Sequence, residues 1–173
     1  MAFWASKDSQ PKRQHRFIMS LGKRSGQNQL PSWVVSNVSR PAMEISTIEH
    51  QYLNHSFKFP GRAKWQDVSV TLKDPLSPDA SKELYAILAD AGYLPPSGSP
   101  ESDAFNQAFT KASFAEAIGT ISIKALDSAG DEVERFTLFN PIIVSANWGN
   151  FDYSSEELVE LQLTIAYDYA TIE

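Results

Sequence analysis

The 173-residue chain contains no cysteine, and this absence excludes disulfide bonds, thiol nucleophiles and zinc–thiolate sites. A cysteine-free chain also fits assembly in a reducing cytoplasm. No apolar run approaches the roughly eighteen residues that a membrane-spanning helix needs, so no such helix is expected. The first residues show no apolar stretch after their charges, and we therefore expect no signal peptide.

Motifs for catalysis are also missing. The chain has no His-Glu-x-x-His spacing, no Gly-x-Ser-x-Gly elbow and no phosphate-binding Gly-Lys-Ser/Thr loop. Two of its three histidines, His50 and His55, lie in a segment expected to be extended, where an odd spacing predicts side chains on opposite faces. The sequence therefore predicts neither an enzyme nor a cofactor or metal site.

The net charge of −6 conceals an uneven distribution. Residues 1–40 carry seven Lys or Arg and one Asp, whereas residues 101–173 carry three Lys or Arg and thirteen Asp or Glu. Opposite ends of this kind let copies of one protein attract each other. The simpler interpretation is a solvated basic arm and a solvated acidic surface. Binding of nucleic acid by the arm is disfavoured, because the whole chain is acidic and the aromatic residues precede the positive charges.

Alternation of apolar and polar residues is the strongest structural pattern. From Glu160 to Tyr169 the apolar positions are Leu161, Leu163, Ile165, Tyr167 and Tyr169. This period of two predicts a single half-buried antiparallel strand. Further strands are expected at residues 16–21, 33–38, 67–73, 120–127, 133–139 and 142–148, which makes about seven in all.

Turn and cap residues place the remaining elements. A helix is expected from Pro78 to Ala91, with Ser77 as its N-cap, and a second, shorter one within residues 101–118. Residues 44–62 are predicted to form a projecting hairpin or long loop that ends in a turn at residues 59–62, and residues 1–15 an N-terminal arm. The predicted fold is a mainly-β single domain over residues 1–173, an antiparallel β-sandwich or small barrel with a flanking α-helix.

Four blocks along the chain carry a family resemblance. They are Phe3-Trp4-Ala5-Ser6-Lys7-Asp8 with the basic residues that follow, Phe57-Lys58-Phe59-Pro60-Gly61-Arg62 with the strand after it, residues 117–140, and the run Gly149-x-x-Asp152-Tyr153-Ser154-Ser155-x-Glu157-Leu158-Val159-Glu160. In this order they resemble tail tube proteins of contractile-tail bacteriophages. The poorest match is Leu76 to Ala117, and Tyr167-Asp168-Tyr169 stands where that family commonly has Tyr-Asp-Trp.

The resemblance implies a structural virion protein. Such proteins self-assemble into hexameric rings, and stacked rings form the inner tail tube that conducts DNA during ejection inside a contractile sheath. The implied partners are further copies of the chain, the tail sheath protein, and the baseplate and tail terminator proteins. DNA would pass through the lumen without sequence-specific binding. The implied location is the tail of the virion, after assembly in the host cytoplasm.

Two sets of site residues follow from this reading. The arm and the hairpin carry aromatic groups with no evident partner in their own chain, so the candidate inter-subunit contacts are Phe3, Trp4, Lys12, Arg13, Tyr52, Phe57, Phe59 and Arg62. Lumen-facing carboxylates are implied by the resemblance and the acidic C-terminal part, with Asp131, Glu132 and Glu134 as candidates.

Two alternatives stay open. One is the tube protein of a related contractile injection or secretion system, in which the cargo is protein. The other is a monomeric β-barrel that binds a small apolar ligand.

Overall fold

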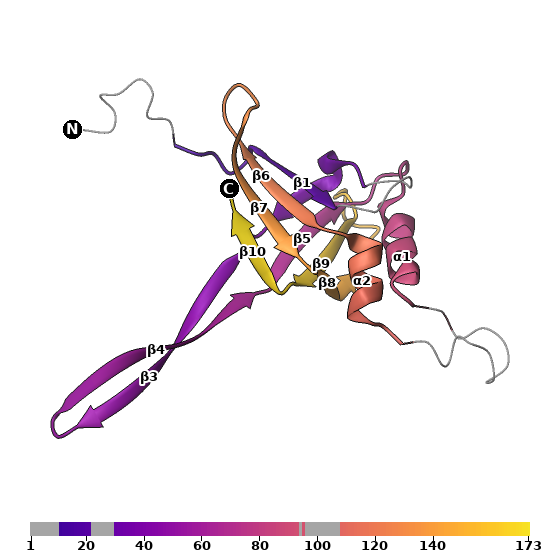
Figure 1. Cartoon of the computed structure of the whole chain (residues 1–173). Helices are drawn as coiled ribbons and strands as arrows, with labels where there is room; N and C mark the ends of the chain where they lie inside the picture. The colour runs from indigo at the N-terminus through magenta and orange to yellow at the C-terminus, as the bar shows by residue number, and fades with distance from the viewer. Residues whose placement is uncertain (1–10, 22–29, 94, 96–107) are drawn as a thin grey trace.

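The computed structural model describes residues 11–21, 30–93, 95 and 108–173. Within them lie two four-stranded antiparallel sheets, a protruding two-stranded hairpin and two α-helices (Figure 1). The first sheet has the order β1 (Phe17–Leu21), β6 (Ile121–Leu126), β7 (Glu132–Phe139) and β10 (Tyr169–Ile172). The second has the order β2 (Val35–Val38), β5 (Val68–Lys73), β9 (Glu160–Ala166) and β8 (Ile142–Asn147). A short 3-10 turn, η2 (Ser32–Val34), leads into β2, so the strand expected over residues 33–38 begins later than predicted.

One hydrophobic core unites the two sheets and the two helices α1 (Ala80–Asp90) and α2 (Lys111–Ile118). Alternate residues of the central strands point into it, as the period of two requires. The buried members of the four inner strands are Val68, Val70 and Leu72 of β5, Ile121 and Ile123 of β6, Phe136 and Leu138 of β7, and Leu161, Leu163 and Ile165 of β9. The described strands form two open sheets and no closed barrel, which confirms the sandwich and not the small barrel.

The predicted C-terminal strand is divided between the two sheets. β9 ends at Ala166, the chain leaves the second sheet at Tyr167–Asp168, and β10 pairs with β7 on the edge of the first sheet. The crossover is held by Asp168, whose backbone N–H donates to the carbonyl of Phe139 at 3.1 Å. Alternation in the sequence continues across this step, although in β10 Ala170 packs against the core and Tyr169 is exposed, so periodicity alone did not reveal the break.

The hairpin of β3 (Ala42–Tyr52) and β4 (His55–Gln66) turns at residues 53–54, so the turn predicted at residues 59–62 is wrong. Pro60 and Gly61 instead lie inside β4 at a bulge, where Ser46 of β3 opposes two residues of β4. A bulge accepts proline and glycine within a strand. An added Cβ at Gly61 would collide with the Ser46 hydroxyl, so a larger residue there would force that side chain to move.

The same turn corrects the expectation for the two histidines. His50 opposes Phe57 and His55 opposes Tyr52, two positions apart in the ladder. Residues at alternate rungs share a face. The two imidazoles therefore lie on the same face of the hairpin, because the chain reverses between them.

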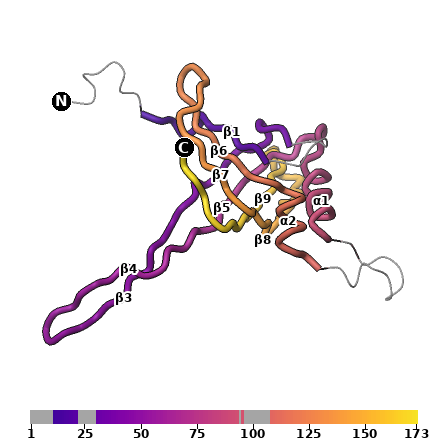
Figure 2. The backbone as a smooth tube through the Cα atoms, viewed as in Figure 1, coloured from indigo at the N-terminus to yellow at the C-terminus, as the bar shows by residue number. Residues whose placement is uncertain are grey.

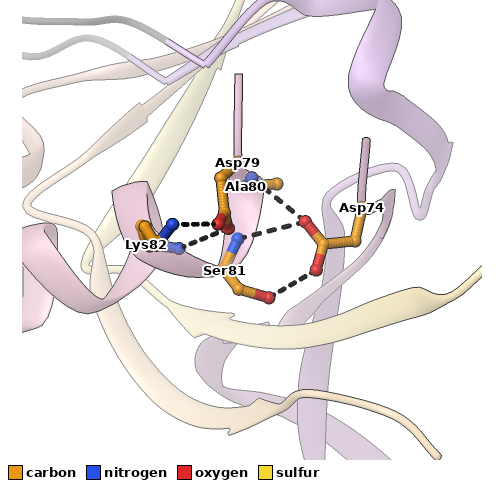
Figure 3. Close-up of polar contacts among 5 residues, drawn as sticks. All are labelled: Asp74, Asp79, Ala80, Ser81 and Lys82. Atoms are coloured by element: carbon orange, nitrogen blue, oxygen red, sulfur yellow. Dashed lines mark hydrogen bonds and ion pairs between the residues drawn. The ribbon is translucent and has the colours of Figure 1, made fainter. Parts of the chain in front are cut away.

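Helix α1 begins at Ala80, two residues after the start that the sequence suggests. Its N-cap is Asp79 and not Ser77, because the Asp79 carboxylate accepts the backbone N–H of Lys82 at 3.0 Å (Figure 3). The Lys82 ammonium also pairs with this carboxylate at 2.9 Å. Asp outranks most residues as an N-cap for this reason, and the hydrogen bond from the Lys82 side chain is the main cause that lowers the pKa of Asp79.

A second carboxylate completes the start of α1. Asp74 accepts the backbone N–H groups of Ala80 at 3.1 Å and Ser81 at 3.3 Å, so the first exposed donors of the helix are satisfied (Figure 3). The shorter helix expected within residues 101–118 is confirmed as α2, which Thr110 caps by accepting the N–H of Ser113 at 3.0 Å.

Candidate assembly surfaces

The β3–β4 hairpin extends far from the sandwich, and Figure 2 traces it from its root to its tip. Every residue of β3 is exposed, and in β4 only Gly61 and Trp65 are partly covered. Apart from Trp65, its large apolar residues are more than half exposed; these are Met43, Ile45, Ile48, Tyr52, Leu53, Phe57 and Phe59. Monomeric proteins rarely expose apolar groups in such a contiguous set.

The two strands of the hairpin are paired from Ala42 to Tyr52, but, apart from Trp65, their large apolar side chains are not covered by the rest of the described chain. Two cross-strand pairs are apolar, Met43 with Trp65 and Ile48 with Phe59, and two join opposite charges, Glu44 with Lys64 and Glu49 with Lys58. Directly opposed residues lie on the same face of the ladder. Each half of the hairpin thus has an apolar face and a charged face, with the phase of alternation changing at the bulge between Ile45 and Ile48.

Aromatic packing anchors the root of the hairpin. The rings of Trp65 and Tyr167 lie 6.0 Å apart between centroids, at an angle of 51°. The hydroxyl oxygen of Tyr167 is buried. Burial, together with the nearby Asp67 carboxylate, raises the pKa of Tyr167. The root is therefore part of the body of the protein, whereas the distal hairpin, residues 46–62 from the bulge to the tip, is not.

The structure brings together two residues predicted for different roles. Lys12 donates to the carboxylate of Glu134 at 2.8 Å, and Arg40 donates to the same oxygen at 2.7 Å. The hydrogen bond from Lys12 is the main cause that lowers the pKa of Glu134. Arg40 also lies 4.9 Å above the ring of Phe136. Lys12 thus contacts its own sandwich; Phe3 and Trp4 lie outside the described residues.

Arg13 and Asp131, two further candidate residues, are exposed. The carbonyl of Arg13 accepts the N–H of Arg16 at 3.2 Å in the turn before β1. In the β6–β7 turn, the backbone N–H of Asp131 donates to the Asp127 carboxylate at 2.9 Å. All three acidic candidates belong to this one hairpin of the first sheet, and their lumen position stays a prediction.

The negative charge of Glu132 is balanced by ion pairs within its own chain. Arg135 holds both of its oxygens, at 2.5 and 2.9 Å, and Lys124 lies at 3.0 Å. These hydrogen bonds, the one from Arg135 first, lower the pKa of Glu132 to about 2.

The loop 148–159 between β8 and β9 is a further exposed surface, for which the sequence predicted no contact role. Its side chains Phe151, Tyr153 and Leu158 are exposed, and Phe151 and Leu158 line an open groove of about 790 Å³. The pattern that marks it is large apolar residues without alternation, placed among acidic and polar ones. The loop falls inside the block that resembles tube proteins, although no contact role was predicted for it.

Each sheet also ends in strands that lack a second neighbour among the described residues. They are β1 and β10 in the first sheet and β2 and β8 in the second. Exposed edges present unpaired N–H and C=O groups to any strand that approaches. Within the described ranges there is no group of three His, Asp or Glu placed to hold a metal ion, and no helix there has the length and apolarity to cross a membrane.

Solved structures with the same arrangement come from contractile machines. A chain of the anti-feeding prophage cap, described as the tube terminating cap, matches with a TM-score of 0.66 and 20% identity, covering 100% of this chain and 99% of its own. The chain has the fold of such tube-system proteins. A chain from the sheath/tube terminator of the extracellular contractile injection system PVC matches at 0.66 and 18%, covering 95% and 97%. One from the PVC sheath–tube complex matches at 0.64 and 18%, covering 94% and 91%.

Sequence comparison gives no such match. No protein-family model and no curated protein sequence matches the chain. The shared fold therefore rests on three-dimensional likeness, which these structures show over nearly the full length of both chains.

Proposed function

We propose that this chain is a structural tube protein of a contractile tail. Copies assemble into hexameric rings, and the rings stack into the inner tube that conducts DNA inside a contractile sheath. The observation that carries the proposal is the β3–β4 hairpin, a long ordered element whose apolar side chains find no cover in their own chain. A monomer gains nothing from holding that face in water, whereas an assembly buries it.

The geometry of the monomer fits an assembly with two kinds of contact. Unpaired edge strands in both sheets supply lateral contacts, and a ring closes when such a heterologous contact repeats by rotation. The protruding hairpin supplies a contact of another direction, which does not close and so builds a filament. Residues Tyr52, Phe57, Phe59 and Arg62 of the hairpin belong to this second contact.

The partners follow from the same role. A tube inside a sheath contacts the sheath protein along its outer surface, the baseplate at one end and a terminator at the other. Support comes from the kinds of complex in which the similar chains were solved, which include a baseplate, a tube terminating cap and a sheath–tube complex. The location proposed is the tail of a phage-like particle, assembled in the cytoplasm of the host cell.

A tube of an extracellular contractile injection system is the second candidate. It is favoured by the origin of the similar structures, which are the anti-feeding prophage and PVC. The two candidates differ in cargo, DNA in one and protein in the other. Nuclease-protected DNA in purified particles would support the phage tail, and tube-enclosed protein without DNA the injection system.

The monomeric ligand-binding barrel has less support. Its description requires a closed barrel around an enclosed apolar cavity. The described strands form two open sheets, and the groove beside residues 148–159 opens to solvent.

Negative-stain electron microscopy of the purified chain tests the proposal. We expect rings with six-fold symmetry, and stacked tubes at higher protein concentration. A protein that stays monomeric at every concentration and ionic strength, with no rings on the grid, would refute it.

A further inference from the structure

The distal hairpin and the loop 148–159 lie at opposite ends of one strand. β5 begins two residues after the end of the hairpin at Gln66. It ends at Lys73, whose ammonium pairs with Glu160 at 2.5 Å, directly after the loop. The backbone N–H of Asp74 donates to the carbonyl of Val159 at 3.0 Å, which fixes the loop to this end of β5. The hairpin therefore points away from one end of the second sheet while the loop caps the other, and Figure 1 shows the hairpin leaving the body of the protein.

The loop presents large apolar groups that its own chain does not cover. The exposed fractions of Phe151, Tyr153 and Leu158 are 92%, 112% and 70%. These groups are presented by a defined backbone. The Asp152 carboxylate accepts the backbone N–H of Ser154 at 2.8 Å and its hydroxyl at 2.7 Å.

Close packing also fixes the start of the loop. Gly149 has φ +75°, and a Cβ there would collide with the carbonyl oxygen of Glu160. The backbone N–H of Gly149 donates to the side chain of Asn147 at 3.0 Å. Groove, aromatic groups and backbone thus form one surface at this end of the molecule.

The two surfaces have opposite charge. The loop carries Asp152, Glu156 and Glu157 and no Lys or Arg, whereas residues 42–66 carry three Lys or Arg against two Glu. Arg62, at the bulge, has no ion pair within the described part of the chain, and the carboxylates of Glu156 and Glu157 have none there either. The hairpin face is aromatic and basic, and the loop is aromatic and acidic.

We propose that the loop 148–159 and its groove receive the distal hairpin of a second copy of this chain. Arg62 approaches Glu156 and Glu157, and the exposed aromatic groups of both surfaces cover each other. The reach of the hairpin permits this contact, since eleven residues at about 3.3 Å each span roughly 36 Å. Because donor and acceptor surfaces lie at opposite ends of β5, each copy offers a free hairpin after its loop is filled. Such a head-to-tail contact repeats without closing and gives the axial step of a filament.

The inference rests on the proposed function for its direction, the stacking of rings, but names a contact of its own. Introduced cysteines test it cleanly because the chain has no native cysteine. The test variant carries Phe57→Cys and Tyr153→Cys, and is oxidised under conditions of assembly. We expect disulfide-linked multimers in non-reducing gels. The two single variants give the background.

A matched control separates this contact from random collision. It carries Phe57→Cys and Tyr85→Cys, since Tyr85 is an exposed aromatic residue of α1 that lies outside the proposed contact and packs edge-on against Tyr93. If the control pair links as strongly as the test pair, or if the test pair does not exceed the single variants, the proposal is overturned.

Charge reversal gives an independent readout. Arg62→Glu places like charges together and should raise the protein concentration needed for tubes roughly tenfold or more. Glu156→Arg with Glu157→Arg should do the same, and combining the three changes should restore assembly. A triple variant as defective as either parent, with its thermal midpoint unchanged, contradicts the pairing.

The experiments also separate the two proposals. Tubes of the wild-type chain without the hairpin–loop cross-link leave the proposed function intact and refute the contact. Cross-linked chains of copies that never form rings refute the proposed function and retain the contact.

Discussion

The sandwich and the hairpin have the same alternation of residues and opposite burial. In β9, Leu161, Leu163 and Ile165 are almost fully covered by the core. In the hairpin, Ile48 and Phe59 are more than half exposed although they pair across strands just as well. Alternation therefore indicates which face of a strand is apolar. Only the surrounding structure shows whether residues of the same chain bury that face.

The difference has an energetic meaning. Full burial of a large apolar side chain stabilises by about 1.5–3 kcal/mol. In the sandwich this gain belongs to folding, whereas in the hairpin it is available only to association. Substitutions should accordingly divide into those that unfold the chain and those that leave it folded and change its assembly.

The largest effect on folding is expected in the core. Leu138 of β7 is fully buried, and it opposes Ile121 and Ala170 on the neighbouring strands. Leu138→Ala should lower the free energy of unfolding by about 2–5 kcal/mol, because it removes apolar contacts and leaves a cavity. Urea denaturation followed by tryptophan fluorescence measures this free energy. A loss below about 0.5 kcal/mol would mean that the core is no more sensitive to substitution than the hairpin.

Two glycines allow the stability of a packed loop to be compared with that of an open turn: Gly149 lies in the loop 148–159 and Gly130 in the β6–β7 turn. Gly149 and Gly130 both have positive φ, but a Cβ would collide with Glu160 only at Gly149 and would meet nothing within 4 Å at Gly130. Gly130→Ala should cost about 1 kcal/mol from the backbone alone. Gly149→Ala should cost roughly 1–3 kcal/mol more, because its neighbours must move.

Thermal unfolding of both glycine variants tests this difference. Equal losses of stability would show that the loop 148–159 is not held against β9 in solution.

The N-cap of α1 provides a smaller and more local test. Asp79→Ala should destabilise the chain by about 1 kcal/mol, because the N–H of Lys82 loses its acceptor. Asp79→Asn keeps an acceptor and is the matched control, expected to be nearly neutral. If Ser77 were the effective cap, as the sequence suggests, Ser77→Ala would be the more damaging change in the same denaturation experiment.

The smallest effect concerns Glu132 and acid. Its pKa is lowered to about 2 by Arg135 and Lys124, so its contribution to stability is present above the ordinary pKa of 4.5 and is lost as the pH falls from there through about 2. Wild type should therefore lose its advantage over Glu132→Gln across this window. Thermal midpoints of the two proteins between pH 7 and pH 2 measure it, and a constant difference would mean that the ion pairs do not persist in solution.

Much of the sandwich could be predicted because its strands are short and one face of each is buried. Val68, Val70 and Leu72 alternate without exception, and the β6–β7 turn has the expected Gly130. What failed were positions where tertiary context decides. Pro60 and Gly61 favour a turn locally, but the bulge opposite Ser46 absorbs them.

The candidate sites were predicted only in outline. The hairpin was recognised as projecting, and Tyr52, Phe57, Phe59 and Arg62 do lie on it. The intrachain pairing of Glu134 with Lys12 was not foreseen, because residues 122 positions apart give no local pattern. The exposure of Phe151 and Tyr153 was likewise missed, since a segment without regular structure carries no periodicity from which burial can be inferred.

If a second copy of the chain covers the apolar face of the hairpin, removal of that face should abolish assembly and leave the fold intact. The direct measurement compares wild type with Phe57→Ser/Phe59→Ser by analytical ultracentrifugation and electron microscopy, alongside thermal unfolding of each. We expect the double variant to fold, with an unfolding free energy within about 0.5 kcal/mol of that of the wild-type monomer. We also expect that it no longer forms tubes. A double variant that assembles as wild type does, or one that unfolds because those rings were needed by its own chain, would contradict it.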